Sequence, residues 1–112
     1  GAAALGEALQ VNAVLTALDL SGNSIHDGGA TAIGKALKVN GVLKTLNLDG
    51  HELDLPKLRG TDSVTSLDLS REGLGPASAI VIASLVAGNR VLTDLNLYNN
   101  KIGPEGGVAI GK

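Results

Sequence analysis

The sequence predicts an α/β solenoid, in which parallel strands line one face and helices line the opposite face. Three observations lead to this fold class. One leucine pattern recurs along the chain, apolar residues at helical spacing fill the stretches between its copies, and proline or aspartate stands where those helices should begin. A chain of 112 residues is long enough for one continuous core. We therefore expect a single right-handed solenoid domain over residues 1–112.

The recurring pattern is Leu-x-x-Leu-x-Leu-x-x-Asn-x-Ile. Its four copies begin at Leu15, Leu43, Val64 and Leu92, so successive copies are 28, 21 and 28 residues apart. A single unit of this size cannot bury its apolar face alone, and stacked neighbours supply the core. Each copy is expected to add one parallel strand to the concave face, near residues 16–20, 44–48, 65–69 and 93–97.

Helices are expected between the strands, on the convex face. Apolar side chains recur at helical spacing in residues 2–12, 29–40 and 77–89. Pro76 and Pro104 suit a first helical turn, because proline has a fixed φ and no N–H to satisfy. Asp27 takes the equivalent place in another copy and favours a helix N-terminus electrostatically. The predicted helices cover residues 2–12, 29–38 and 77–87.

The second repeat is short. Its connection, residues 54–63, lacks seven residues relative to the first repeat, or about two helical turns. Pro56 and Gly60 argue against a full helix there. Leu55 and Leu58 are expected to reach the core from an extended or 3₁₀ segment. No helix longer than one turn is expected, and the convex face should carry a notch between the flanking helices.

The stretches GGATAIGKALKVNGVLKTLNL and GPEGGVAIGK resemble the ribonuclease-inhibitor-like class of leucine-rich repeats. The resemblance covers nearly the whole chain and implies a horseshoe segment. Related repeats occur in NOD-like receptors and Ran-type GTPase-activating proteins. The resemblance therefore implies an intracellular protein-binding or scaffolding module. Two alternatives remain: a structural or self-associating segment of a larger sensor-type protein, and a GTPase regulator.

Composition excludes several classes of function. A net charge of −2 and a single aromatic residue argue against a nucleic-acid partner. No apolar run is long enough to span a membrane. The absence of cysteine removes disulfides and thiolate metal sites. Together with the intracellular proteins that the repeats resemble, it makes the cytoplasm the expected compartment. His26 and His51 lie in different repeats without a third ligand. No cofactor, metal site or catalytic group is predicted.

The concave face is expected to be polar and acidic. Leu18 and Leu20 point inward, so the alternating strand residues must point out. The middle outward position of each strand then forms one ladder down the face, made of Asp19, Asn47, Asp68 and Asn96. Asp49 and Asp94 lie beside this ladder. Such a surface favours a basic protein partner. An equally simple interpretation is that exposed strand positions are polar for solubility alone.

Two further residues are candidate partner contacts. Tyr98 is the only aromatic residue and falls on the concave face near the C-terminal end. Tyrosine is enriched among residues that carry binding energy, although a lone tyrosine is often incidental. Arg71, at the exit of the third strand, is placed to reach a carboxylate or phosphate, unless it is a solvated loop charge.

The asparagine of the pattern is a candidate structural residue, because it faces inward and satisfies backbone groups where the strand turns. Asn23 and Asn100 hold this position in the intact copies, and His51 and Glu72 replace it in the middle two. The two replacements form a pair that bridges adjacent layers, or both turn outward to water. Both interpretations are open at this point.

Neither end of the sequence carries a polar capping unit. The simpler expectation is a fragment of a longer array. The alternative is a symmetric homodimer that covers a terminal repeat through apolar residues, either Leu5 and Leu9 or Val108 and Ile110.

Overall fold

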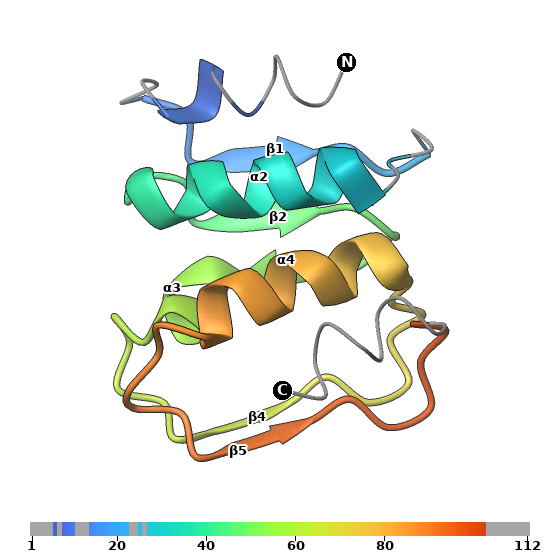
Figure 1. The fold of residues 1–112 in the computed structure, drawn as a ribbon. Helices are drawn as coiled ribbons and strands as arrows, with labels where there is room; N and C mark the ends of the chain where they lie inside the picture. Colours follow the sequence, from blue (N-terminus) through green and yellow to red (C-terminus); the bar gives the residue numbers. More distant parts are fainter. Residues whose placement is uncertain (1–5, 7, 11–13, 23–24, 26, 103–112) are drawn as a thin grey trace.

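The computed structural model describes residues 6, 8–10, 14–22, 25 and 27–102. In chain order these contain β1 (Ala17–Asp19), α2 (Asp27–Val39), β2 (Thr45–Asn47), β3 (Glu52–Asp54), α3 (Leu55–Arg59), β4 (Ser66–Asp68), α4 (Pro76–Val86) and β5 (Asp94–Asn96) (Figure 1). Four of the strands lie inside the ranges expected from the repeats. Residues 6 and 8–10 are helical, and the rest of the helix expected over residues 2–12 lies outside the described residues.

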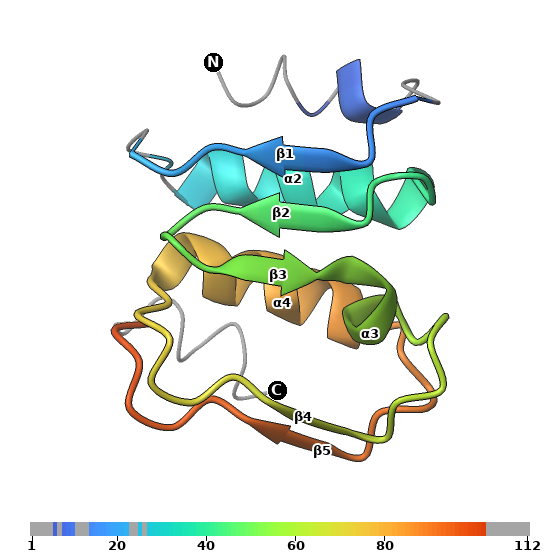
Figure 2. The ribbon, with the colours of Figure 1, turned by 180° about the vertical axis from the view of Figure 1, so that it is seen from behind.

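The strands do not form the single parallel sheet that the repeats predict. β1 pairs with β2 in parallel, β3 pairs with β2 in antiparallel, and β4 and β5 form a separate parallel pair. Figure 2 shows β3 on the side of β2 that faces β4. The chain turns back after β2 through Gly50, whose φ of 91° favours glycine. β3 therefore occupies the edge of β2 that β4 was expected to take. The prediction of one sheet with four parallel strands is wrong.

The connection of the short repeat forms a true α-helix. α3 has five residues, about 1.4 turns, so it is slightly longer than expected and neither extended nor 3₁₀. The Asp54 carboxylate caps it by accepting from the Lys57 N–H, and Gly60 ends it with a φ of 87°. Leu55 and Leu58 are fully buried, as the sequence predicts.

The expected notch between the convex helices is closed where α2 and α4 touch, and a hollow remains only between their C-terminal ends. Figure 1 shows α2 and α4 side by side in one layer. A Cβ atom at Gly34 of α2 would lie 2.6 Å from the Ser84 Oγ and 2.9 Å from the Ser84 Cβ of α4. α3 lies behind α4 on the strand side (Figures 1 and 2). Because α3 does not stand in the helix layer, α4 packs directly against α2.

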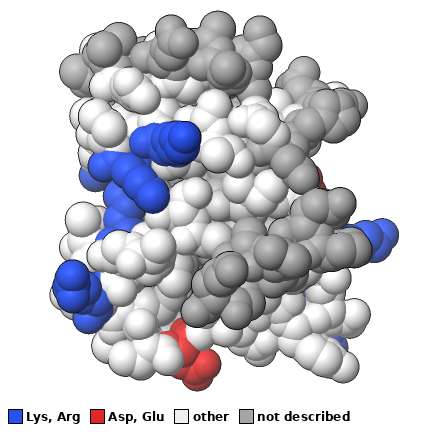
Figure 3. Space-filling view, in the orientation of Figure 1, with Lys and Arg blue, Asp and Glu red and all other residues white. Residues whose placement is uncertain are grey.

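The core lies between these two helices and the strands around β2. Its fully buried members come from α2, β2, β3, α3 and α4 and include Ile33, Leu37, Leu46, Leu53, Leu58 and Ile82. The strands at the two ends are less covered, and Leu18, Leu67 and Leu95 are only partly buried. On the helix side, Lys and Arg side chains gather toward the C-terminal end of α2 (Figure 3). The strand face and the helix face therefore differ in charge as well as in structure.

Candidate partner-binding site

The residue that ends each repeat strand also holds the turn that follows it. A side-chain oxygen accepts from a backbone N–H two or three residues further on in four places: Asp19 from Ser21, Asn47 from Gly50, Asp68 from Ser70, and Asn96 from Tyr98. Asp and Asn favour such turns because their short side chains reach the backbone just ahead. The central row of the predicted ladder therefore has a local structural role.

The same row is split into two parts. Asp19 lies opposite Asn47, and Asp68 lies opposite Asn96, but the other neighbour of Asn47 is Glu52. Asp19, Asn47 and Glu52, with His51, line a shallow polar hollow of about 640 Å³ over β1, β2 and β3. The prediction of one continuous ladder is wrong, because β3 lies between the pair Asp19 and Asn47 and the pair Asp68 and Asn96.

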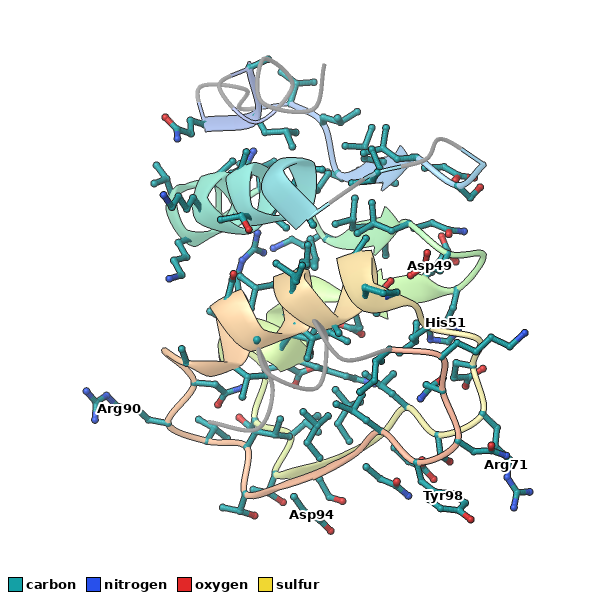
Figure 4. The ribbon with its side chains drawn as sticks, turned by 45° about the vertical axis from the view of Figure 1, so that its right-hand side comes forward. Asp49, His51, Arg71, Arg90, Asp94 and Tyr98 are labelled. Atoms are coloured by element: carbon teal, nitrogen blue, oxygen red, sulfur yellow. The ribbon has the colours of Figure 1, made fainter. Side chains whose placement is uncertain are left out.

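Asp49 has a structural partner on the helix side. Its Oδ2 accepts from the Gly75 N–H at 2.8 Å and from the Ser78 hydroxyl. Gly75 precedes α4 and has no side chain with which to cap it. A carboxylate beside a helix N-terminus is stabilising because it meets the positive end of the helix dipole. Asp49, beside the start of α4 in Figure 4, therefore links the β2 turn to that helix.

The remaining candidate contacts gather on β4, β5 and their turns. Asp68 and Asn96 end the two strands, Asp94 begins β5, and all three are exposed. The Arg71 N–H donates to the Tyr98 carbonyl at 3.0 Å, so the two turns lie together. Tyr98 is 69% exposed. Figure 4 shows the Arg71 and Tyr98 side chains pointing outward on the same side of the molecule.

The backbone of Arg71 is strained. One residue in each strand-end turn has a positive φ: Gly22 at 79°, Gly50 at 91°, Arg71 at 58° and Asn99 at 62°. Glycine adopts this region freely and asparagine tolerates it, whereas a long side chain costs about 1–2 kcal/mol. Strained residues often cluster at functional sites. Arg71 is therefore the one turn residue in this series whose type is not favoured by its backbone.

Two carboxylates of the strand face have lowered pKa values. For Asp68 the causes are the side-chain and backbone hydrogen bonds from Ser70, with a smaller contribution from the charge of Arg71. The pKa of Asp19 is lowered in the same way by hydrogen bonds from Ser21. Both groups are exposed and remain ionised at neutral pH. The strand face therefore keeps its negative charge.

The predicted structural position faces inward in the last repeat. The Asn100 amide donates to the carbonyls of Leu69 and Leu97, and its oxygen accepts from the N–H groups of Glu72 and Leu74. In the middle repeats the side chains pair across the break between the sheets, with His51 Nδ1 3.5 Å from Glu72 Oε1. Of the two interpretations of His51 and Glu72, the structure therefore has the pair that bridges adjacent layers. Asn23 lies outside the described residues.

Comparison with known families identifies the repeats. A family model described as leucine-rich repeat matches residues 11–34 and 88–111. The chain is a leucine-rich repeat protein. No curated protein matches the chain. The two matched stretches contain the first and last copies of the pattern, and the irregular middle repeats lie between them. Leucine-rich repeat domains generally mediate protein–protein interactions.

A second asparagine position stabilises these leucine-rich repeats. Asn89 accepts from the N–H groups of Val91 and Leu92 and donates to the carbonyls of Lys57 and Leu58. Asn40 holds the same kind of turn and donates to the Leu9 carbonyl. Sequence reasoning missed this role. The signal was present, because Asn-x-Val-Leu occurs at residues 12–15, 40–43 and 89–92.

Arg59 was also missed. Its guanidinium donates to three backbone carbonyls near the end of α2, those of Leu37, Asn40 and Leu43. Burial lowers its pKa. The side chain therefore fastens the short repeat to the first long helix of the leucine-rich repeat protein.

Other predicted features are less informative. Among the described residues, no helix is both long and apolar enough to cross a membrane, and no three His, Asp or Glu side chains form a group that would hold a metal ion. Of the apolar residues expected in a homodimer, Leu9 is 2% exposed. Leu5, Val108 and Ile110 lie outside the described residues. Leu9 therefore offers almost no apolar surface to a second copy.

Proposed function

We propose that this leucine-rich repeat protein is a protein-binding or scaffolding module of the cytoplasm. Its partner site is the acidic strand face and the adjoining loops, centred on the turns that carry Arg71 and Tyr98. The observation that supports this proposal best is the pairing of an exposed tyrosine with a strained arginine in two adjacent turns. The strand residues around them supply negative charge.

The chemistry of the two side chains suits a protein contact. Tyrosine and arginine dominate binding energy at interfaces, because each combines a large contact surface with polar groups that orient the partner. Tyr98 has no covering side chain over most of its surface, being 69% exposed. The strain at Arg71 is consistent with a side chain retained for a contact outside the fold.

The partner carries a basic surface. Asp68 and Asp94 flank the pair on β4 and β5, and Asp19 adds a third exposed carboxylate on β1. Negative charge gathered on one face raises the association rate of a positively charged partner. The Arg71 guanidinium then sits at the rim, where it can pair with a carboxylate of the same partner.

Affinity capture followed by calorimetry tests this function. The wild-type protein, Tyr98→Ala, Arg71→Ala and Arg90→Ala are used as bait, and a captured protein is then titrated against each. Tyr98→Ala and Arg71→Ala should each weaken binding by about tenfold or more. Arg90 is the matched control, since it is exposed and lies on the opposite side from Arg71 in Figure 4.

The result has a clear alternative. If Arg90→Ala weakens binding as much as Arg71→Ala does, or if both β4–β5 variants keep wild-type affinity, the partner site is not on this surface.

A further inference from the structure

A hollow with a basic rim lies on the helix side, away from the strand face. It has a volume of about 550 Å³ and opens between the C-terminal ends of α2 and α4, with the end of α3 as its third wall. Its lining residues are Leu37, Lys38, Arg59, Thr61, Ser84, Leu85, Ala87 and Gly88. None of these residues belongs to the proposed site on the strand face.

The floor of the hollow is apolar. Leu37 and Leu85 are core residues, exposed by 0% and 3%. Ala87 lies at the rim and is exposed. Val39, which directly follows Lys38, is 68% exposed and is one of the few large apolar side chains on the surface. Leu37 and Leu85 therefore form the buried base of the hollow, and Ala87 and Val39 are the apolar side chains that a partner can contact there.

The rim is positively charged. Lys38 and Arg59 line the hollow, and Lys35 lies outside the lining, one turn before Lys38 on α2; both lysines are exposed. Neither forms an ion pair with another described residue. Arg59 keeps its charge while three of its N–H groups bind carbonyls. In Figure 3 the largest group of blue side chains lies on this side, and the largest red patch lies at the lower edge of the view.

The carbonyl groups at the helix ends do not repel an acidic ligand as free carbonyls would. Arg59 binds those of Leu37 and Asn40. In α4 the last carbonyls accept from the N–H groups of Ala87, Gly88 and Asn89. The nearest acid in sequence, Asp62, is exposed on the loop after α3. The net charge beside the hollow remains positive.

We infer that this hollow docks an acidic peptide segment of a partner protein, which places an apolar side chain against Ala87 and Val39 and carboxylates against Lys38 and the neighbouring Lys35. The charge of this site is opposite to that of the strand face. One molecule can therefore hold a basic partner and an acidic partner at the same time, which gives the scaffolding role two distinct sites.

Titration of a defined peptide tests the inference. The probe is a short fluorescent peptide in which aspartate and glutamate flank a pair of leucines, and its control has lysine at the acidic positions. We expect the acidic peptide to bind and the lysine peptide not to bind. Amide shifts on binding should fall at Lys38, Thr61 and Gly88.

Matched variants sharpen the test in both directions. Lys35→Gln together with Lys38→Gln should weaken binding of the acidic peptide by about tenfold, whereas Lys101→Gln, an exposed lysine outside the lining, should leave it unchanged. Ala87→Lys adds a cation to the rim and should tighten binding several-fold. Lysine is also favourable at a helix C-terminus, so this variant should fold.

Three outcomes overturn the inference. The first is equal binding of the acidic and lysine peptides, and the second is amide shifts that map to β4 and β5. The third is self-association of the protein that Ala87→Lys strengthens while the peptide fails to bind, which makes a second copy the occupant. Loss of peptide binding with intact capture through Tyr98 leaves the proposed function standing.

Discussion

Single residues with positive φ set the geometry of the strand-end turns. Glycine holds this position in the first two repeats, at Gly22 and Gly50, and asparagine holds it in the last, at Asn99. Arg71 is the exception, with a side chain that gains nothing from its backbone conformation. Gly22, Gly50 and Asn99 therefore suit the positive φ of their turns, whereas Arg71 adopts it at a cost.

Replacement of Arg71 should move stability and binding in opposite directions. Arg71→Gly removes the strain and should raise the free energy of unfolding by about 0.5–1 kcal/mol, after allowance for the greater freedom of glycine in the unfolded chain. Urea unfolding of the variant and the wild type measures this change. Arg90→Gly, at an exposed residue with no positive φ, should lower stability or leave it unchanged. A loss of stability in Arg71→Gly would show that the side chain contributes to the fold.

Parity along the strands predicts correctly which side chains of the candidate site are exposed around β5. It places Asp94, Asn96 and Tyr98 outward, because alternation depends only on local backbone geometry. It fails for Asp49, whose hydrogen-bond partners lie 26 and 29 residues further along the chain. Contacts of that length depend on how the helix layer packs, which strand alternation does not report.

At the scale of elements, the asparagines that precede β2 and β5 each join two neighbouring units. Asn89 connects the end of α4 to α3 through its donors and to the next strand through its acceptor. Four backbone groups depend on one side chain. Removal of that side chain leaves partly buried groups without partners.

Truncation of Asn89 should therefore be strongly destabilising. Asn89→Ala should lower the free energy of unfolding by about 2–6 kcal/mol, because four hydrogen bonds are lost at about 0.5–1.5 kcal/mol each. Asn89→Asp keeps the acceptor that binds the N–H groups of Val91 and Leu92 but loses the donors. It should therefore fall between Ala and the wild type in thermal or urea unfolding. Equal losses for Asp and Ala would mean that the two acceptor bonds add nothing.

The regular elements follow from the sequence, and the irregular ones do not. Helical spacing over more than two turns identified α2 and α4, since many residues contribute to the same period. β3 has only Glu52, Leu53 and Asp54, too few for alternation to be distinguished from the turn of the repeat. The copy of the pattern that begins at Leu43 puts Leu53 at its Ile position. Only its pairing with Leu46 makes it a strand residue.

At the scale of the whole molecule, one half contains the sheet of β1, β2 and β3 and the other contains the pair β4 and β5. The two halves are joined mainly through the helix layer. No described backbone hydrogen bonds of a sheet connect β3 to β4. Instead α2 lies against α4 at the close approach of Gly34 and Ser84. The side-chain links between the halves include those of Asn89, Asp49 and the His51–Glu72 pair.

Filling that close approach should separate the halves. Gly34→Ala should lower the free energy of unfolding by about 1–3 kcal/mol through overpacking, although alanine is the better helix former. Gly28→Ala in the same helix meets no atom within 4 Å and should be neutral or stabilising. Combining Gly34→Ala with Ser84→Gly should cost less than the sum of the single changes, because the glycine gives the new methyl group room. Strict additivity in urea unfolding would rule out contact at this point.

The antiparallel strand β3 also decides where this protein can be lengthened. Duplicating residues 15–42 and inserting the copy after residue 42 would add a parallel strand and a helix that repeat β1 and α2. The added strand could pair in parallel on both sides, as β1 pairs with β2. Duplicating residues 43–63 would instead place a second reversed strand beside β3, with no parallel edge for the next unit to join. Repeat gain, by an engineer or by unequal crossing-over, is therefore open within each half and blocked at the boundary between them.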